Sequence, residues 1–401
     1  MQPDQILTEA DRCVKCGLCL PNCPTYRATL NEGDSPRGRI ALIQALAAAT
    51  LESPRLHRHL DRCLGCRACE ESCPSGVRYG LLLDAAREIQ RRQGRGLNRH
   101  LLELISRLPY SGVSAPLLAL YRHSGLRRLV RRLGGKRLQR LDRLLPGRTG
   151  GGWQPDYRPP DQVLGRVGLF TGCVGRLADR PALDAAIRVL NRLGLEVVVP
   201  PGQGCCGALH QHNGMPGRAL TLAAGNRRAF NGRELEAVLY LASGCGAQLH
   251  DYPGLGEPFD APVMDISRFL CGRIRDREHR FRPLPRRVLL HTPCSQRNIL
   301  REPDAAGPLL QQIPELDLCR LPDGIGCCGA AGSYLLTQPA MADRLRRRTL
   351  EAVAGEHVEI LVTSNTGCAL HLAAGLEMTG SPVRVMHPVE LFEQQLESEA
   401  D

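Results

Sequence analysis

Lysine is almost absent from this sequence of 401 residues, which contains only Lys15 and Lys136 alongside fifty arginines. Aromatic residues make up only 4% of the chain, and no recognised nucleic-acid-binding motif occurs. Proteins that bind single-stranded nucleic acid stack the bases on aromatic side chains. The composition therefore argues against a nucleic-acid partner, although the net charge is +11.

Long hydrophobic runs and nucleotide-binding loops are also missing. No apolar run reaches about 18 residues, so we expect no membrane-spanning helix. The first residues are polar and already include cysteines, which is unlike a secretory signal, and we expect a cytoplasmic protein. Neither G-x-G-x-x-G after a strand nor G-x-x-x-x-G-K-[ST] is present, and no hydrolase triad stands out. The sequence thus gives no support for a flavin, nicotinamide or nucleotide site on this chain.

Cysteine, in contrast, is abundant at 18 residues. In a chain without a secretory signal, many cysteines indicate metal binding or redox chemistry rather than disulfides. The first eight form two copies of C-x2-C-x2-C-x3-C-P, a pattern typical of bacterial [4Fe–4S] proteins. Cysteines three residues apart wrap a tight loop around a cubane, and the proline turns the chain away. The metal ligands predicted by the two copies are Cys13, Cys16, Cys19 and Cys23, and Cys63, Cys66, Cys69 and Cys73.

The fourth cysteine of each copy needs a separate assignment, because in two-cluster proteins it binds the other cluster. One predicted cluster therefore has Cys13, Cys16, Cys19 and Cys73, and the other has Cys63, Cys66, Cys69 and Cys23. Zinc sites and structural disulfides are the alternatives. Zinc usually takes separated pairs of ligands and has no need of two tetrads that end in Cys-Pro. We therefore expect two [4Fe–4S] clusters.

The chain divides into four regions. We expect an α+β multidomain protein in which residues 1–80 form an α-helical ferredoxin module, with a helix over 35–49 that begins at Ser-Pro. Residues 81–152 form an arginine-rich helical segment, divided at Pro109, Pro116 and Gly134–Gly135, and end in the flexible stretch PGRTGGG. Residues 163–281 and 282–401 are two copies of an α/β cysteine-rich domain.

The duplication is visible in the remaining cysteines, whose offsets are 121 to 123 residues, with matching flanks such as VGLFTGC and VLLHTPC. Apolar runs at 167–170, 196–200 and 237–241 alternate with helical patterns at 182–193 and 217–231, which predicts parallel sheets with crossover helices. The cysteines fall after predicted strand ends, where open α/β sheets bind ligands. The repeated cysteines are Cys173, Cys205, Cys206 and Cys245, and Cys294, Cys327, Cys328 and Cys368.

These eight cysteines are candidate cofactor ligands for a further iron–sulfur or other metal centre, although two adjacent cysteines rarely serve one cubane. Gly207 and Gly329 permit unusual backbone angles after each pair. The alternative is buried free cysteine acting as a small hydrophobe, which is our interpretation of the unrepeated Cys271 and Cys319. Polar candidates near the sulfurs are Gln248, His371, His210, His212 and His291.

The segments CVKCGLCLPNCPTY (13–26), DSPRGRI (34–40) and HLDRCLGCRACEESCPSG (59–76), together with the two Cys-Cys-Gly repeats, resemble the iron–sulfur subunits of glycolate oxidase (glycolate dehydrogenase). The resemblance implies an electron-transfer subunit that is not catalytic alone. It would pass electrons from flavoprotein dehydrogenase subunits, which carry the flavin, through two [4Fe–4S] clusters towards a quinone or respiratory acceptor. Related subunits serving D-lactate or anaerobic glycerol-3-phosphate dehydrogenases are the alternatives.

One departure concerns the heterodisulfide-reductase-like relatives, which imply a third function, thiol redox catalysis. In those relatives each repeat ends in C-x-x-C, and five cysteines hold a non-cubane cluster. Here the final positions are Gln248 and His371, so each repeat keeps four cysteines. A disulfide-cleaving cluster is thus less expected, and a different metal centre, docking or quinone contact stays open.

The positive charge belongs to one segment. Residues 80–150 hold fifteen arginines and one lysine against four acidic residues, a local net charge of +12. Within it, Leu126, Leu129, Val130 and Leu133 lie at helical spacing, bordered by arginines. Two interpretations remain: helices packed on the protein's own core with a solvated basic rim, or contact of residues 97–145 with an acidic partner or anionic lipid. The second places a cytoplasmic protein at the inner face of the bacterial cell membrane.

Overall fold

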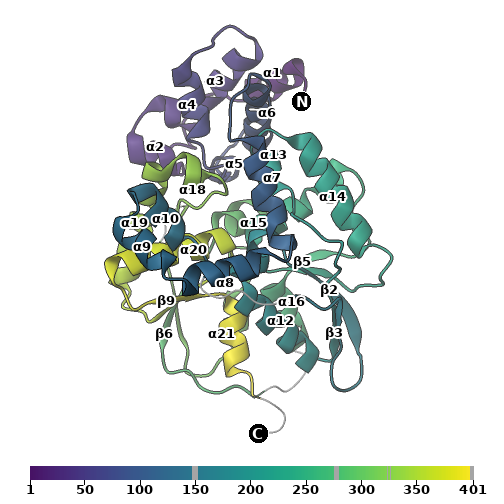
Figure 1. Cartoon of the computed structure of the whole chain (residues 1–401). Coiled ribbons are helices and arrows are strands. Elements are labelled where there is room, and N and C mark those ends of the chain that lie inside the picture. Colours follow the sequence, from purple (N-terminus) through teal and green to yellow (C-terminus); the bar gives the residue numbers. More distant parts are fainter. Residues whose placement is uncertain (147–151, 275–279, 323, 326, 398–401) are drawn as a thin grey trace.

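The computed structural model describes residues 1–146, 152–274, 280–322, 324–325 and 327–397. The N-terminal helices lie at one end of the molecule, above two β-sheets whose strands run through its lower half (Figure 1). The flexible stretch expected at 146–152 falls almost entirely outside the described residues. None of the described helices is long and apolar enough to cross a membrane.

Residues 1–80, all of which the structure describes, contain helices and no strand. The predicted helix after Ser35 is confirmed as α3, where the Ser35 side chain accepts a hydrogen bond from the Gly38 N–H and Pro36 takes the first helical position. Apolar faces of the module's helices meet in one core that includes Ile6, Ile43 and Leu82. The helices are α1 (Pro3–Asp11), α2 (Pro24–Thr29), α3 (Pro36–Ala47), α4 (Pro54–Asp61), α5 (Ala68–Glu71) and α6 (Tyr79–Arg92).

The arginine-rich segment forms four short helices, α7 (Arg99–Arg107), α8 (Ser114–His123), α9 (Leu126–Leu133) and α10 (Lys136–Arg143). Breaks occur at Pro109 and at Gly134–Gly135, as the sequence predicts. The break expected at Pro116 is wrong, because this proline lies in the first turn of α8. The N–H groups of a first turn have no partner within the helix, so a proline there removes nothing.

Both C-terminal repeats contain a parallel sheet of the same order. The first sheet is β1-β3-β2-β4-β5, in which only the edge strand β1 is antiparallel, and the second is β7-β6-β8-β9. The predicted parallel α/β repeats are thereby confirmed. The strands are β1 (Asp156–Tyr157), β2 (Gly165–Phe170), β3 (Leu195–Val198), β4 (Val238–Tyr240), β5 (Val263–Asp265), β6 (Arg287–His291), β7 (Asp317–Arg320), β8 (Ile360–Thr363) and β9 (Arg384–Met386).

The two repeats share one core. Helix α12 (Arg180–Arg192) of the first packs against α21 (Pro388–Gln395) of the second, and α16 (Ile266–Ile274) of the first packs against α17 (Gly307–Leu310) of the second. Because α12 matches α17 and α16 matches α21 in chain order, these are two copies of one contact. Val389 and Phe392 are fully buried among first-repeat side chains. The boundary at residues 281 and 282 therefore stays a prediction.

Candidate functional site

The first predicted cluster set lies at the surface. Cys13, Cys16 and Cys19 follow α1 in a loop, and together with Cys73 they line one cavity. The loop closes because Lys15 and Gly17 both take positive φ angles, of 58° and 88°, and the Arg37 side chain donates to the Lys15 carbonyl at 3.1 Å.

The second set is more enclosed, since Cys23 and Cys63 are buried and Cys66 and Cys69 are half-buried. Cys63, Cys66 and Cys69 line a second cavity with Cys23, and Cys69 also lines the first, so the two cavities adjoin. The Cys63 sulfur receives the Gly65 N–H at 3.4 Å and the Tyr79 hydroxyl at 3.5 Å. The structure thus brings each fourth cysteine to the three cysteines of the other copy, as the sequence assignment requires.

The donor sets fit iron–sulfur clusters. All eighteen cysteines lie in the described part of the chain, and all are free. Burial raises the pKa values of the Cys66 and Cys69 thiols well above their usual range. Buried thiolates need a nearby cation, and bound metal supplies it by displacing the protons. The four sulfurs assigned to each cluster, with N–H and O–H donors aimed at Cys63, match what a cubane requires.

Sequence reasoning missed a buried charge network beside the second set. Arg39 is 1% exposed, and its guanidinium donates to Thr25 Oγ1 at 2.9 Å and lies 4.0 Å from the Cys23 sulfur. Asp34 is fully buried and pairs with Arg39, with His59 at 2.9 Å and with Arg62 at 3.2 Å. Burial alone would lower the pKa of Arg39, but the neighbouring acidic groups, Cys63 first and with it Cys23 and Asp34, raise it. The guanidinium stays charged and, because it also donates to the His59 carbonyl at 2.7 Å, joins the Cys23 loop to α4.

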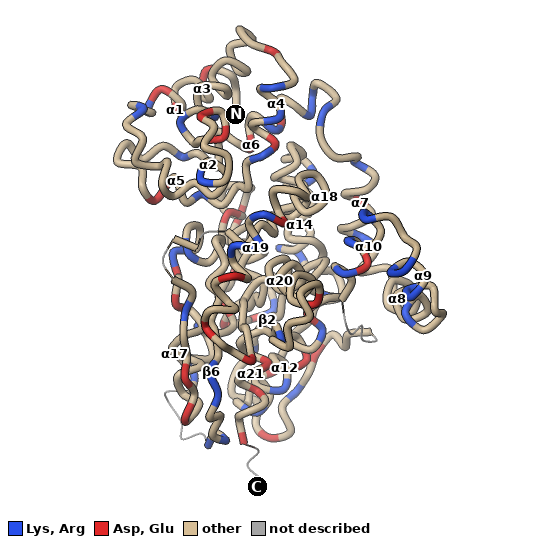
Figure 2. Tube along the Cα trace, turned by 90° about the vertical axis from the view of Figure 1, so that its left-hand side faces the viewer, with Lys and Arg blue, Asp and Glu red and all other residues tan. Residues whose placement is uncertain are grey.

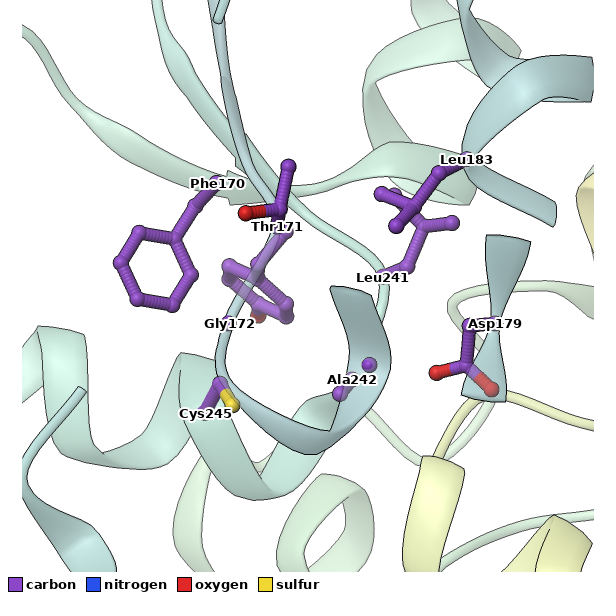
Figure 3. Close-up of a pocket in the computed structure, with 10 residues that line it drawn as sticks. Phe170, Thr171, Gly172, Asp179, Leu183, Leu241, Ala242 and Cys245 are labelled. Carbon is purple, nitrogen blue, oxygen red and sulfur yellow. The ribbon is translucent and has the colours of Figure 1, made fainter. Parts of the chain in front are cut away.

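In the first repeat the four cysteines meet at the carboxyl ends of β2, β3 and β4. The Cys173 sulfur lies 3.5 Å from that of Cys205, and contact with Cys205 together with burial raises the pKa of Cys173. A cavity beside Cys245 has a mainly apolar wall that includes Phe170, Leu241 and Ala242 (Figure 3). Asp179 stands at its far side, and burial raises the pKa of this carboxyl to about 7.

In the second repeat the equivalent four cysteines also meet, and a histidine joins them. The Cys294 and Cys327 sulfurs are 3.7 Å apart, and those of Cys328 and Cys368 are 3.0 Å apart. A ring nitrogen of His291 lies within 4.8 Å of the Cys328 and Cys368 sulfurs. Burial, with a contribution from the positive charge of Arg297, lowers the pKa of His291 to about 4, so its imidazole is neutral at pH 7.

The other polar candidates lie elsewhere. His371 Nε2 faces the Ala342 carbonyl at 3.2 Å, and His212 pairs with Asp84 at 3.0 Å. Gln248 and His210 are both buried, and the group of metal-binding atoms found among the described residues does not include His210. Cys271 packs against the shared core, and Cys319 bonds the Val288 carbonyl.

The backbone conformation after each cysteine pair requires a glycine. Gly207 and Gly329 have φ of 97° and 90°, and each N–H points to the sulfur two residues earlier. A Cβ on Gly329 would lie 2.5 Å from the Ala342 carbonyl oxygen.

We expect Gly329→Ala to lower the free energy of unfolding by about 2 kcal/mol or more, from strain at positive φ plus this collision. Gly225→Ala is the control, since its Cβ would meet nothing within 4 Å inside helix α14 (Pro216–Phe230). That change should be neutral or stabilising by about 0.5–1 kcal/mol. Urea denaturation of the wild type and of both variants measures these free energies of unfolding. Equal stabilities of the two variants would contradict the prediction.

Comparison with known proteins divides the chain into the same ferredoxin module and two cysteine-rich repeats. Residues 9–77 match the model of a 4Fe-4S dicluster domain, and residues 167–250 and 288–373 each match that of a cysteine-rich domain. The chain is 34% identical to the glycolate oxidase iron-sulfur subunit of Escherichia coli, covering 100% of this chain and 96% of that protein. It is 32% identical to the probable glycolate oxidase iron-sulfur subunit of Bacillus subtilis, covering 95% and 92%. The chain belongs to the family of glycolate oxidase iron–sulfur subunits.

Membership of this family confirms the resemblance seen in the sequence. This glycolate oxidase iron–sulfur subunit homologue is an electron-transfer subunit of an oxidoreductase, and it uses iron–sulfur chemistry. A fumarate reductase (CoM/CoB) subunit of Methanothermobacter marburgensis is more distant, at 28% identity over 95% of this chain and 71% of that protein. A glutamate racemase structure from Bacillus anthracis, at 11% identity over 58% of this chain and 80% of that one, has a TM-score of 0.29, too low to support any conclusion.

Proposed function

We propose that this chain is the electron-transfer subunit of a glycolate dehydrogenase complex, which oxidises glycolate to glyoxylate on a flavoprotein partner and delivers electrons towards a quinone. The observation that supports this most is the pair of adjoining cysteine-lined cavities, of which the first includes the exposed Cys16 and the second the buried Cys23 and Cys63. When bound, a [4Fe–4S] cluster exchanges single electrons, whereas oxidation of a hydroxy acid releases two, which a flavin can take up together. The chain has no flavin motif, so the flavin is assigned to the partner.

The surface around the first cavity suits a partner subunit. Cys16 is exposed, and the neighbouring Val14 and Leu18 are 70% and 58% exposed. Exposed apolar side chains beside a redox site mark a contact surface. Lys15 lies within the same loop, and Arg37 donates to its carbonyl. These residues would orient the partner, while Arg39 and Asp34 fix the loops that carry the buried ligands.

Co-purification with native partners tests this function. The complex should reduce a quinone analogue with glycolate as donor, and D-lactate and glycerol 3-phosphate should be much poorer donors. D-lactate belongs in the assay because lactate utilization protein A of Geobacillus thermodenitrificans is 27% identical over 57% of this chain. Turnover with D-lactate or glycerol 3-phosphate alone would reassign the substrate and leave the electron-transfer role intact.

The arginine-rich helices supply a second contact surface. Leu126, Leu129 and Leu133 are exposed, Leu133 at 78%, so α9 does not pack on the protein's own core. Arg127 and Arg131 instead bond Asp142, which is buried among α8, α9 and α10. These helices stand out at the side of the molecule (Figure 2). We propose that residues 97–145 contact anionic lipid, which holds a cytoplasmic protein at the inner face of the bacterial cell membrane.

Charge reversal of the exposed Arg128 and Arg132 should then weaken binding to anionic vesicles by more than about tenfold, since each basic residue near such a surface contributes about 1 kcal/mol. Arg127 and Arg131 are left unchanged because their reversal would break the Asp142 network. The control reverses Arg55 and Arg58, which are exposed on α4. Co-sedimentation that falls equally for both double variants would speak against a specific lipid-binding surface.

A further inference from the structure

The two cysteine-rich repeats carry the same four sulfurs in different surroundings. Matching the repeats by their cysteines places His291 of the second where the first has Phe170. The same alignment pairs Thr363 with Tyr240. It also pairs Asn365 with Ala242. At all three positions the second repeat holds a small polar or metal-binding side chain where the first holds an aromatic ring or a methyl group.

These three side chains act on the sulfurs or on each other. One ring nitrogen of His291 pairs with Thr363 Oγ1 at 2.9 Å, and His291 is only 2% exposed. A polar partner of this kind orients the imidazole of a metal-binding histidine. The Asn365 amide donates to the Cys368 sulfur at 3.4 Å, as a hydrogen-bond donor to a ligating thiolate does.

The first repeat has neither the histidine nor the asparagine amide at the equivalent positions. Ala242 has no amide to give to Cys245, and Phe170 packs in an apolar cluster with Tyr240 and Cys206. Among the described residues, His291, Cys328 and Cys368 of the second repeat bring three metal-binding atoms within reach of one another, and no such set occurs in the first. The sulfurs are equivalent, so the difference lies in the added nitrogen ligand.

We propose that the second repeat, and not the first, holds a mononuclear metal centre in which His291, Cys328 and Cys368 are ligands. These three are the ligand atoms that lie within 4.8 Å of one another, so the protein leaves a fourth coordination position open. A set of two sulfurs and one imidazole nitrogen suits Zn²⁺ or Fe²⁺. Adjacent Cys327 and Cys328 are poorly placed to share a cubane, so the centre contains no inorganic sulfide.

The position of this centre connects the second repeat to the ferredoxin module. Cys327 and Cys294 pack in one cluster with Cys66 of the ferredoxin module. The Asn298 amide donates to the Cys66 carbonyl at 2.8 Å, and the Tyr334 hydroxyl donates to the Arg62 carbonyl at 2.9 Å. The metal centre therefore lies against the buried cysteine set and stabilises the surface on which the ferredoxin module rests. This metal centre goes beyond the proposed function, and its presence does not depend on which substrate the complex oxidises.

Metal analysis of the full chain, purified anaerobically, tests the centre. A [4Fe–4S] cluster contains iron and sulfide in equal amounts, so the total metal of the wild type should exceed acid-labile sulfide by about one atom per chain. His291→Phe, which installs the residue of the first repeat, should lose that excess and keep the sulfide. His371→Gln, which likewise installs the first-repeat residue, is the matched control and should keep the excess.

An excess that survives in His291→Phe, or no excess in the wild type, would overturn the proposal, and so would extra iron accompanied by equal sulfide. X-ray absorption at the edge of the excess metal in the wild type must show both sulfur and imidazole ligands. This measurement needs no variant, so it decides even where His291→Phe fails to fold. Loss of the two cubanes would instead lower sulfide, so the two failures are distinguishable.

Discussion

Replacing Cys23 by alanine is expected to abolish the buried cluster of Cys63, Cys66 and Cys69 and to leave the exposed cluster intact. Cys73→Ala should do the reverse. Each change should remove up to about four of eight iron atoms, because each removes one ligand of one cubane. The structure supports this crossed assignment, since Cys23 lines the cavity of the second set and Cys73 that of the first.

Electron paramagnetic resonance of the reduced protein distinguishes the two variants. The exposed cluster should respond to a water-soluble relaxing agent and the buried one should not. Cys23→Ala must therefore keep the accessible signal, and Cys73→Ala must keep the protected one. Cys271→Ala is the control, since this cysteine packs on the shared core far from either cavity. If Cys23→Ala instead eliminated the accessible signal, each pattern would bind its own cluster.

Asp34→Ala is expected to be the most destabilising single change in the ferredoxin module. It would leave the Arg39 guanidinium buried without its carboxylate, and such a loss costs about 3–5 kcal/mol. The same change frees His59 and Arg62, which both bond Asp34. The midpoint of anaerobic urea unfolding, followed by helix content and cluster absorbance, measures the loss.

Glu32→Ala provides the comparison. Glu32 pairs with Arg37 at the surface, where both side chains are substantially exposed, so its loss should cost less than about 1 kcal/mol. Equal effects of the two changes would show that the buried network contributes nothing special.

The pH dependence of stability follows from the same carboxylate. Burial alone would raise the pKa of Asp34, but the hydrogen bond with His59 and the charge of Arg39 lower it below its usual value. The folded state therefore holds the ionised carboxylate more strongly than the unfolded chain does. Its stabilisation is complete above the usual carboxyl pKa and disappears as pH falls through the lowered value. Asp34→Ala should flatten the stability profile in that acidic range.

Much of this architecture could be predicted from local patterns. The repeat offset identified the duplication, the strand patterns matched β2, β3 and β4, and the Ser-Pro signal located α3, because these features depend on residues close in sequence. The pattern of two-cluster proteins assigned Cys73 to the first set and Cys23 to the second, and each lines the cavity of that set.

What could not be predicted depends on contacts between distant segments. Nothing local indicates that α21 packs on α12, or that Arg39 would be buried against Cys23 while Arg37, two residues earlier, stays about one-third exposed. The choice between His371 and His291 shows the same limit. His371 is three residues from Cys368 but faces α19 (Pro339–Gly355), whereas His291 reaches the sulfurs because β6 and β8 are adjacent strands. The one usable signal was the mismatch of His291 with Phe170 between the repeats.

Iron and acid-labile sulfide in the anaerobically purified chain test the central claim most directly. Two [4Fe–4S] clusters require about eight sulfide ions and about eight iron atoms per chain. Reduction should then give two distinguishable cluster signals, one exposed and one protected. About four sulfide per chain with a single signal, or zinc in place of iron with no sulfide, would contradict the assignment of Cys13, Cys16, Cys19 and Cys73 and of Cys63, Cys66, Cys69 and Cys23 to two [4Fe–4S] clusters.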